Sequence, residues 1–148
     1  MRTFYVFNVN DYFFTMYRET PYRIYEMLED IYHIKNYDLR MTVRLYSQMV
    51  CKINKLMMNE YLYNNYSMYK DYNRDCNTHS ISTNYEYSRL VVSNTHLKIK
   101  TNRNYPIFFE SLNRYNNNIF VCDFENKDYF WLDKIIEKDR QTKEYLVQ

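Results

Sequence analysis

The chain has 148 residues, a formal net charge of +2 and no glycine or alanine. Phosphate-binding loops, dinucleotide turns and nucleophile elbows need glycine where the backbone adopts a positive φ or approaches a ligand, so the composition excludes their usual forms. A hydrophobic content of 46% excludes a disordered chain, and the nearly neutral charge gives little support to a nucleic-acid-binding protein.

The chain begins with a predicted strand and two short helices. Residues 3–9 are aromatic and β-branched, which favours a strand. Asn10 or Asp11 then caps a helix over residues 11–19. A second, amphipathic helix follows over residues 21–34, because proline at the first helical position is a typical start signal and the apolar residues recur on one face.

The strongest periodicity of the chain lies in the segment that follows. Apolar side chains recur there at alternating steps of four and three residues, which predicts a third helix of about five turns with a core-facing stripe. The stripe consists of Leu39, Val43, Tyr46, Val50, Ile53 and Met57. A homotypic coiled coil is the alternative, although it would need more heptads. Residues 61–80 are rich in Tyr and Asn and show no period, so we predict a loop insert there.

The second half is predicted to contain two hairpins and a helix. The helix covers residues 106–115 and ends at an asparagine run, and Asn94 is expected to take the left-handed conformation in the turn of the first hairpin. Residues 140–148 are expected to form a frayed tail after a last helical segment. The hairpins pair the following strands: 87–93 with 96–102, and 119–125 with 129–133.

Local strand pairing and separate helices indicate an α+β fold. We expect a single two-layer domain over residues 1–148, with a mainly antiparallel sheet and helices packed on one face. The three cysteines are odd in number and widely spaced, and the chain shows neither a secretory leader nor an apolar run of about 18 residues. These features predict a cytoplasmic protein with reduced thiols and no membrane contact.

Two groups of side chains raise the question of catalysis or metal binding. Cys76 and His79 form a CxxH pair and His96 follows, but a zinc site needs about four ligands. Four carboxylates surround the last hairpin, namely Asp123, Glu125, Asp128 and Asp133. They would suit a hydrolase only if they converged in one cleft. Acids in turns are more often solvated. We therefore predict no enzyme activity, no metal and no cofactor.

Two further patterns concern binding. Lys98, Lys100 and Arg103 alternate along one strand, and with the Tyr-rich insert they could bind single-stranded nucleic acid. Lysines also occur on solvated edge strands, where they discourage aggregation. Phe13 and Tyr17 share one helix face and Phe14 lies about 100° away, so a short helix carries more rings than one narrow stripe can bury. Exposed aromatics of this kind often mark partner sites.

Two blocks of the sequence together resemble the bacterial SirA family of sporulation inhibitors of replication: FYVFNVNDYFFTMYRETPYRIYEMLEDIYH at residues 4–33, and IFFESLNRYNNNIFVCDFENKDYFWL at residues 107–132. The second block carries an IFFE-x-L helix start, a strand that ends in DF and a K-x-Y-x-WL return.

The resemblance implies an adaptor without enzyme activity that binds the N-terminal domain of the replication initiator DnaA. Such binding interferes with assembly at the origin and restrains initiation. The positions that match the family's partner surface are Phe13 and Tyr17 on the first helix and Gln48 on the longer helix, and we add the neighbouring Phe14. On this reading no direct contact with nucleic acid is expected, and a single-stranded nucleic-acid-binding domain is the alternative function.

Overall fold

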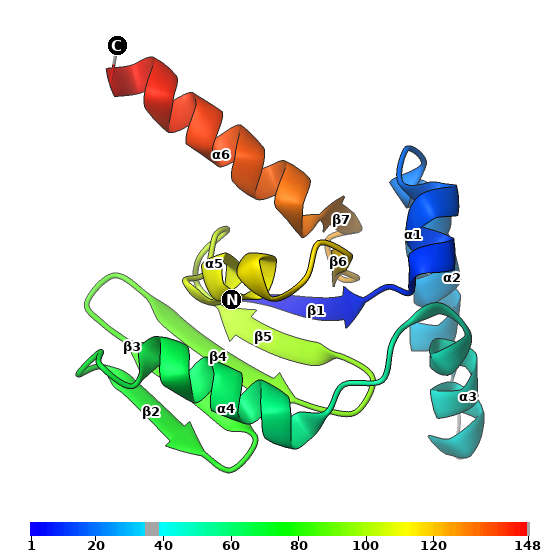
Figure 1. Cartoon of the computed structure of the whole chain (residues 1–148), viewed down its shortest axis with the longest axis horizontal. Helices are drawn as coiled ribbons and strands as arrows, with labels where there is room; N and C mark the ends of the chain where they lie inside the picture. Colours follow the sequence, from blue (N-terminus) through cyan, green and yellow to red (C-terminus); the bar gives the residue numbers. More distant parts are fainter. Residues whose placement is uncertain (35–38, 148) are drawn as a thin grey trace.

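The computed structural model describes residues 1–34 and 39–147. Within these residues six helices accompany one seven-stranded antiparallel sheet, which confirms the α+β class (Figure 1). In chain order the elements are β1 (Arg2–Asn8), α1 (Asp11–Tyr17), α2 (Pro21–Tyr32), α3 (Leu39–Met49), α4 (Lys55–Tyr66), β2 (Tyr72–Asp75), β3 (Thr78–Ser82), β4 (Tyr87–Val92), β5 (Leu97–Thr101), α5 (Phe108–Tyr115), β6 (Ile119–Asp123), β7 (Asp128–Trp131) and α6 (Leu132–Val147).

The first strand of the chain lies inside the sheet. The strand order is β2-β3-β4-β5-β1-β6-β7, so β1 separates the two hairpins that follow later in the sequence. Phe4 is opposite Ile99 of β5, and Val6 is opposite Val121 of β6. The N-terminal strand therefore pairs with one strand of each hairpin and holds the two hairpins in one sheet.

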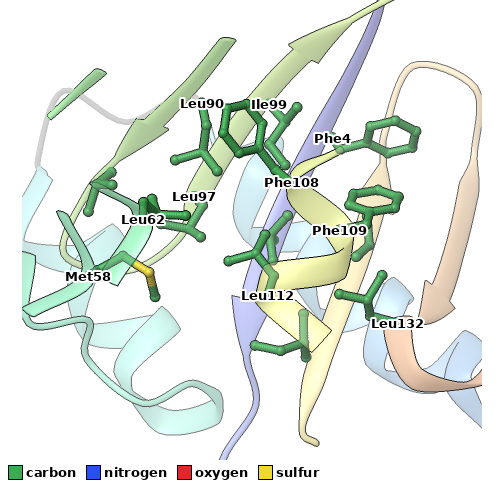
Figure 2. Packing of buried hydrophobic residues seen from close by; sticks show 14 of the residues in the cluster. Phe4, Met58, Leu62, Leu90, Leu97, Ile99, Phe108, Phe109, Leu112 and Leu132 are labelled. Carbon is green, nitrogen blue, oxygen red and sulfur yellow. The ribbon is translucent and has the colours of Figure 1, made fainter. Parts of the chain in front are cut away.

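Helices cover both faces of the sheet, and not one face as we expected from the sequence. Phe4 and Val6 pack in a core with α4, α5 and α6, whereas the alternate residue Phe7 packs in a second core with α2 and α3. Because successive side chains of a strand point to opposite faces, the two cores lie on opposite sides of β1. Figure 2 shows the first core, where Phe108 and Phe109 of α5 approach β1 and β5.

The predicted third helix is two helices. α3 ends at Met49, and the backbone then turns back to the end of β1, where Val50 bridges Val9. Asn54 starts α4, and its side chain accepts a hydrogen bond from the Met57 backbone N–H at 3.1 Å. The predicted stripe is broken for this reason, and its residues fall into two groups. Tyr46, Val50 and Ile53 are buried, Val43 and Met57 are exposed, and the side chain of Leu39 lies outside the described part.

Residues 61–80 are folded, so the predicted loop insert is wrong. They contain the end of α4, all of β2 and part of β3. Two of their tyrosines form hydrogen bonds with polar side chains of other elements: the Tyr66 hydroxyl donates to Ser111 Oγ at 2.6 Å, and Tyr72 Oη lies 2.7 Å from His79 Nδ1. Polar side chains that pair across elements leave no periodic signal in the sequence.

Both predicted hairpins and the helix between them are confirmed. Asn94 is not left-handed, because among the described non-glycine residues a positive φ occurs at Cys76 and Lys127. The β4–β5 turn is instead closed by Ser93, whose hydroxyl donates to the carbonyl of His96 at 2.6 Å. α6 continues to Val147, well beyond the start of the predicted frayed tail.

Candidate partner-binding surface

Asn10 joins the first helix to the end of the third. Its side-chain oxygen accepts a hydrogen bond from the Phe13 backbone N–H at 2.9 Å, which caps α1. Its amide nitrogen donates to the Gln48 carbonyl at 3.0 Å, and its backbone N–H donates to the Met49 carbonyl at 2.9 Å. Gln48 is thereby held beside the beginning of α1, although it is far away in the sequence, and its side chain is exposed.

Four aromatic or apolar side chains line the accessible side of α1. The rings of Phe13 and Tyr17 stack with their centroids 5.7 Å apart, and both are half-buried. The ring of Tyr12 meets that of Phe13 edge-on at 5.5 Å. Tyr12 and Met16 are 64% and 50% exposed, and no residue of α1 is buried. We call the residues Tyr12, Phe13, Met16, Tyr17 and Gln48 the α1–α3 surface.

Tyr12 and Met16 were missed by the sequence analysis. Their spacing of four residues places them on one row of the helix, directly beside the row of Phe13 and Tyr17. That spacing was the available signal.

Phe14, the remaining predicted residue of α1, faces the body of the protein. Its ring meets Trp131 edge-on at 5.1 Å, and the Arg18 guanidinium lies 4.9 Å from the Phe14 ring centroid. Arg18 also forms two hydrogen bonds to Asp133, at 2.9 and 2.6 Å, while Trp131 Nε1 donates to the Arg18 carbonyl at 3.1 Å. These contacts fix α1 against β7 and the start of α6.

The exposed side of α3 extends this region. Met41 and Val43 are about half exposed, and a shallow hollow lies along the helix. The residues that line it are Arg40, Val43, Arg44 and Ser47. Tyr46 and Met49 hold α3 in the second core, so the exposed side chains sit on a fixed helix.

Three of the four late carboxylates bind arginines, whereas Glu125 lies apart from them at a hollow that Lys98 and Lys100 also line. Arg2 donates to Asp123 at 2.9 Å and to Asp128 at 2.8 Å, while Asp133 is paired with Arg18. Burial opposes ionisation of Asp123, but hydrogen bonds from Asn126 and Arg2 outweigh it and hold its pKa below the ordinary value. The chemistry of this hairpin is that of structural ion pairs.

His79 is engaged on both ring nitrogens. Nδ1 lies 2.7 Å from Tyr72 Oη and Nε2 lies 2.8 Å from Asn59 Oδ1. Burial, and to a lesser extent the charge of Arg74, lowers the pKa of His79 to about 4. Among residues 1–34 and 39–147, no group of three or more His, Cys, Asp or Glu side chains is arranged to hold a metal ion. Within the same residues, no helix combines the length and apolar character needed to cross a membrane.

The model of the family described as sporulation inhibitor of replication protein SirA matches residues 2–136, which run from β1 into α6 and include both α1 and α3. A search of curated proteins found no match.

Proposed function

Because the chain belongs to the SirA family of sporulation inhibitors of replication, we propose that it binds the N-terminal domain of the initiator DnaA through the α1–α3 surface. Binding restrains the assembly of the initiator at the origin, in the cytoplasm, and needs no catalytic step. On this proposal residues 1–148 act as one SirA-like domain. The observation that carries the proposal is the double role of Asn10, which brings Gln48 next to the aromatic side of α1.

The physical properties of the surface support a protein partner. Large rings on a rigid helix lose little conformational freedom on binding, and one anchor of this kind contributes about 2 kcal/mol or more when a partner pocket buries it. Phe13 and Tyr17 are such anchors, and Tyr12 and Met16 add exposed apolar area beside them. At the edge of the α1–α3 surface, the side-chain amide of Gln48 offers the partner a hydrogen-bond donor and a hydrogen-bond acceptor. Phe14 serves the same surface indirectly, since it fixes the orientation of α1.

Isothermal titration calorimetry with the purified N-terminal domain of the host DnaA tests the proposal. We expect Phe13→Ala and Tyr17→Ala each to weaken binding roughly thirty-fold, the equivalent of about 2 kcal/mol. Gln48→Ala should cost about 1 kcal/mol, the net value of one hydrogen bond. Tyr85→Ala is the matched control, because Tyr85 is 81% exposed and lies in the β3–β4 turn.

The outcomes separate the function from the surface. No binding of the unmodified protein at tens of micromolar contradicts the proposed partner. Normal binding by folded Phe13→Ala and Tyr17→Ala variants leaves the partner intact and contradicts the assigned surface.

A further inference from the structure

One face of β3, β4 and β5 is open. Along these strands buried side chains alternate with accessible ones, and the buried set faces α4 and α5. The second group of helices packs on β1, β6 and β7 and leaves the other side of β4 and β5 accessible. The accessible residues at the centre of this open face are Arg89, Val91, Lys98 and Lys100.

Three of these side chains are cationic and adjacent. Arg89 of β4 is directly opposite Lys100 of β5, and Lys98 lies two residues away on the same side of β5. Among residues 1–34 and 39–147, none of the three forms an ion pair with a carboxylate. The sheet register therefore concentrates positive charge that the described part of the protein does not neutralise. We call Arg89, Lys98 and Lys100 the basic sheet face.

Aromatic rings border the basic sheet face. Tyr5 of β1 is opposite Lys98, and the Lys98 ammonium lies 5.8 Å from the Tyr5 ring centroid. Tyr32, at the end of α2, stacks on Phe124 with centroids 4.3 Å apart, and its edge meets Tyr5 at 5.3 Å. Tyr32 remains 36% exposed, so part of this ring cluster is accessible from the side of the lysines.

Two neighbouring hollows share Lys98 and Lys100. One, of about 230 Å³, is bordered by the ring cluster together with Thr3 and Glu125. The other, of about 280 Å³, is bordered by Arg89 and Val91. A ligand that occupies both hollows meets rings, hydroxyls and the Glu125 carboxylate at one end and three cations along its length.

We propose that the basic sheet face binds single-stranded nucleic acid, with Arg89, Lys98 and Lys100 on successive phosphates and the Tyr5–Tyr32 ring cluster against a base. Single strands are recognised by this combination of a positively charged groove and stacking rings. An acidic peptide fits less well, because its carboxylates could meet the three cations but would leave the Tyr5–Tyr32 ring cluster without a base to stack on. It also could not add as a further strand, since the backbones of β4 and β5 are paired on both sides. The proposal shares no residue with the α1–α3 surface and does not depend on it.

Lys98 and Lys100 of the predicted basic strand lie in β5, but Arg103 does not, because β5 ends at Thr101. The aromatic partners also differ from those expected. The tyrosines of residues 61–80 belong to the other side of the sheet: Tyr66 is buried in the core with α5, and Tyr72 packs against that core. The rings beside Lys98 come from β1 and α2, two elements far away in the sequence.

The test is fluorescence anisotropy of a labelled oligodeoxythymidylate with the full chain at several salt concentrations. Three phosphate contacts predict a slope of log K against log salt of about −2, and the double variant Lys98→Gln, Lys100→Gln should reduce it to about −0.7. The control is Lys52→Gln, Lys70→Gln, which removes the same charge from exposed positions outside the basic sheet face. Tyr32→Leu should weaken binding roughly tenfold without a change in slope, because stacking is not electrostatic.

Loss of binding in the Lys98, Lys100 variant, with the control unchanged, supports the proposal. Absence of binding by the unmodified chain at low salt overturns it, as does an equal effect of the two double variants. Polyglutamate that competes as well as the oligonucleotide at equal charge also overturns it, in favour of an acidic polypeptide.

Discussion

At the scale of single residues, the neighbours Phe13 and Phe14 have different roles. Phe13 and Phe14 both pack partly against the second core, but Phe14 also meets Trp131 and the Arg18 guanidinium. Within the described residues, the ring contacts of Phe13 are with Tyr12 and Tyr17 of its own helix. We expect Phe14→Ala to lower the free energy of unfolding by about 2 kcal/mol, somewhat less than for a fully buried ring. Phe13→Ala should cost less stability than Phe14→Ala, because it removes no contact with Trp131 or Arg18, and it should act mainly on binding. Urea unfolding of both variants checks this, and equal losses of stability would contradict the distinction.

The buried imidazole of His79 predicts a pH dependence of stability. Its pKa is about 4 in the folded protein, so below pH 6.5, the ordinary value, the unfolded chain binds the additional proton. Stability should therefore be full above pH 6.5 and fall towards pH 4 by up to about 1.4 kcal/mol per pH unit from this group. His96 has the same lowered pKa of about 4, caused by burial and by Lys98, and adds to the effect.

The measurement is the free energy of unfolding between pH 7 and pH 4.5 for the unmodified chain and for His79→Gln. The variant loses hydrogen bonds to Tyr72 and Asn59 and should be less stable at pH 7, but its stability should change less with pH. His33→Gln is the matched control, because it removes an imidazole from an exposed position. An unchanged pH dependence in His79→Gln would show that His79 does not carry the effect.

At the scale of elements, the orientation of α1 relative to α3 depends on one side chain. Asn10→Ala removes the N-cap of α1 and the hydrogen bond to the Gln48 carbonyl. We expect a loss of about 1–2 kcal/mol in stability and a weakened affinity for the DnaA domain. Asn54→Ala is the control, since it removes the N-cap of α4, which contributes no residue to the α1–α3 surface, at a similar cost in stability. Equal affinities of the two variants would argue against the role of Asn10.

Elements with a local signal were predictable from the sequence, and elements defined by distant contacts were not. The aromatic and β-branched residues of β1 and the proline start of α2 carry their own information, and both elements lie where they were expected. The division of the third helix was not visible, because Val50 leaves the helix to pair with Val9 of a distant segment. α4 was ambiguous for another reason: Met57 is exposed and Met58 is buried, so apolar residues occur on both of its sides.

The candidate site shows the same limit. Phe13, Tyr17 and Gln48 came from a resemblance, and Tyr12 and Met16 could have been added from their helical spacing. The hydrogen bonds through which Asn10 brings α1 and α3 together could not, because nothing local in the sequence relates residue 10 to residue 48. The rings beside Lys98 were equally hidden, because Tyr5 of β1 and Tyr32 of α2 are far from Lys98 in the sequence.

At the scale of the whole molecule, Arg2 connects the first strand of the chain with its last hairpin. It reaches from β1 to Asp123 at the end of β6 and to Asp128 at the start of β7. Asp123 is 1% exposed and also accepts a hydrogen bond from Asn126 at 2.7 Å, so its negative charge is fully used inside the fold. The two ion pairs of Arg2 therefore hold β1, β6 and β7 together at one end of these strands.

Acid should weaken the ion pair between Arg2 and Asp123. The pKa of Asp123 is lowered in the folded state, so its contribution is present above the ordinary value of 3.8 and is lost as the pH falls below it. This window lies below the one set by the histidines, and unfolding experiments from pH 4.5 to pH 2.5 separate the two. Asp123→Asn should lose about 1–3 kcal/mol at pH 7, because Arg2 loses a charged acceptor, and should show a smaller further loss below pH 4. Asp71→Asn is the control, because Asp71 lies at an exposed position before β2. If the stability of Asp123→Asn falls with pH as steeply as that of the unmodified chain, the acid sensitivity arises from other groups.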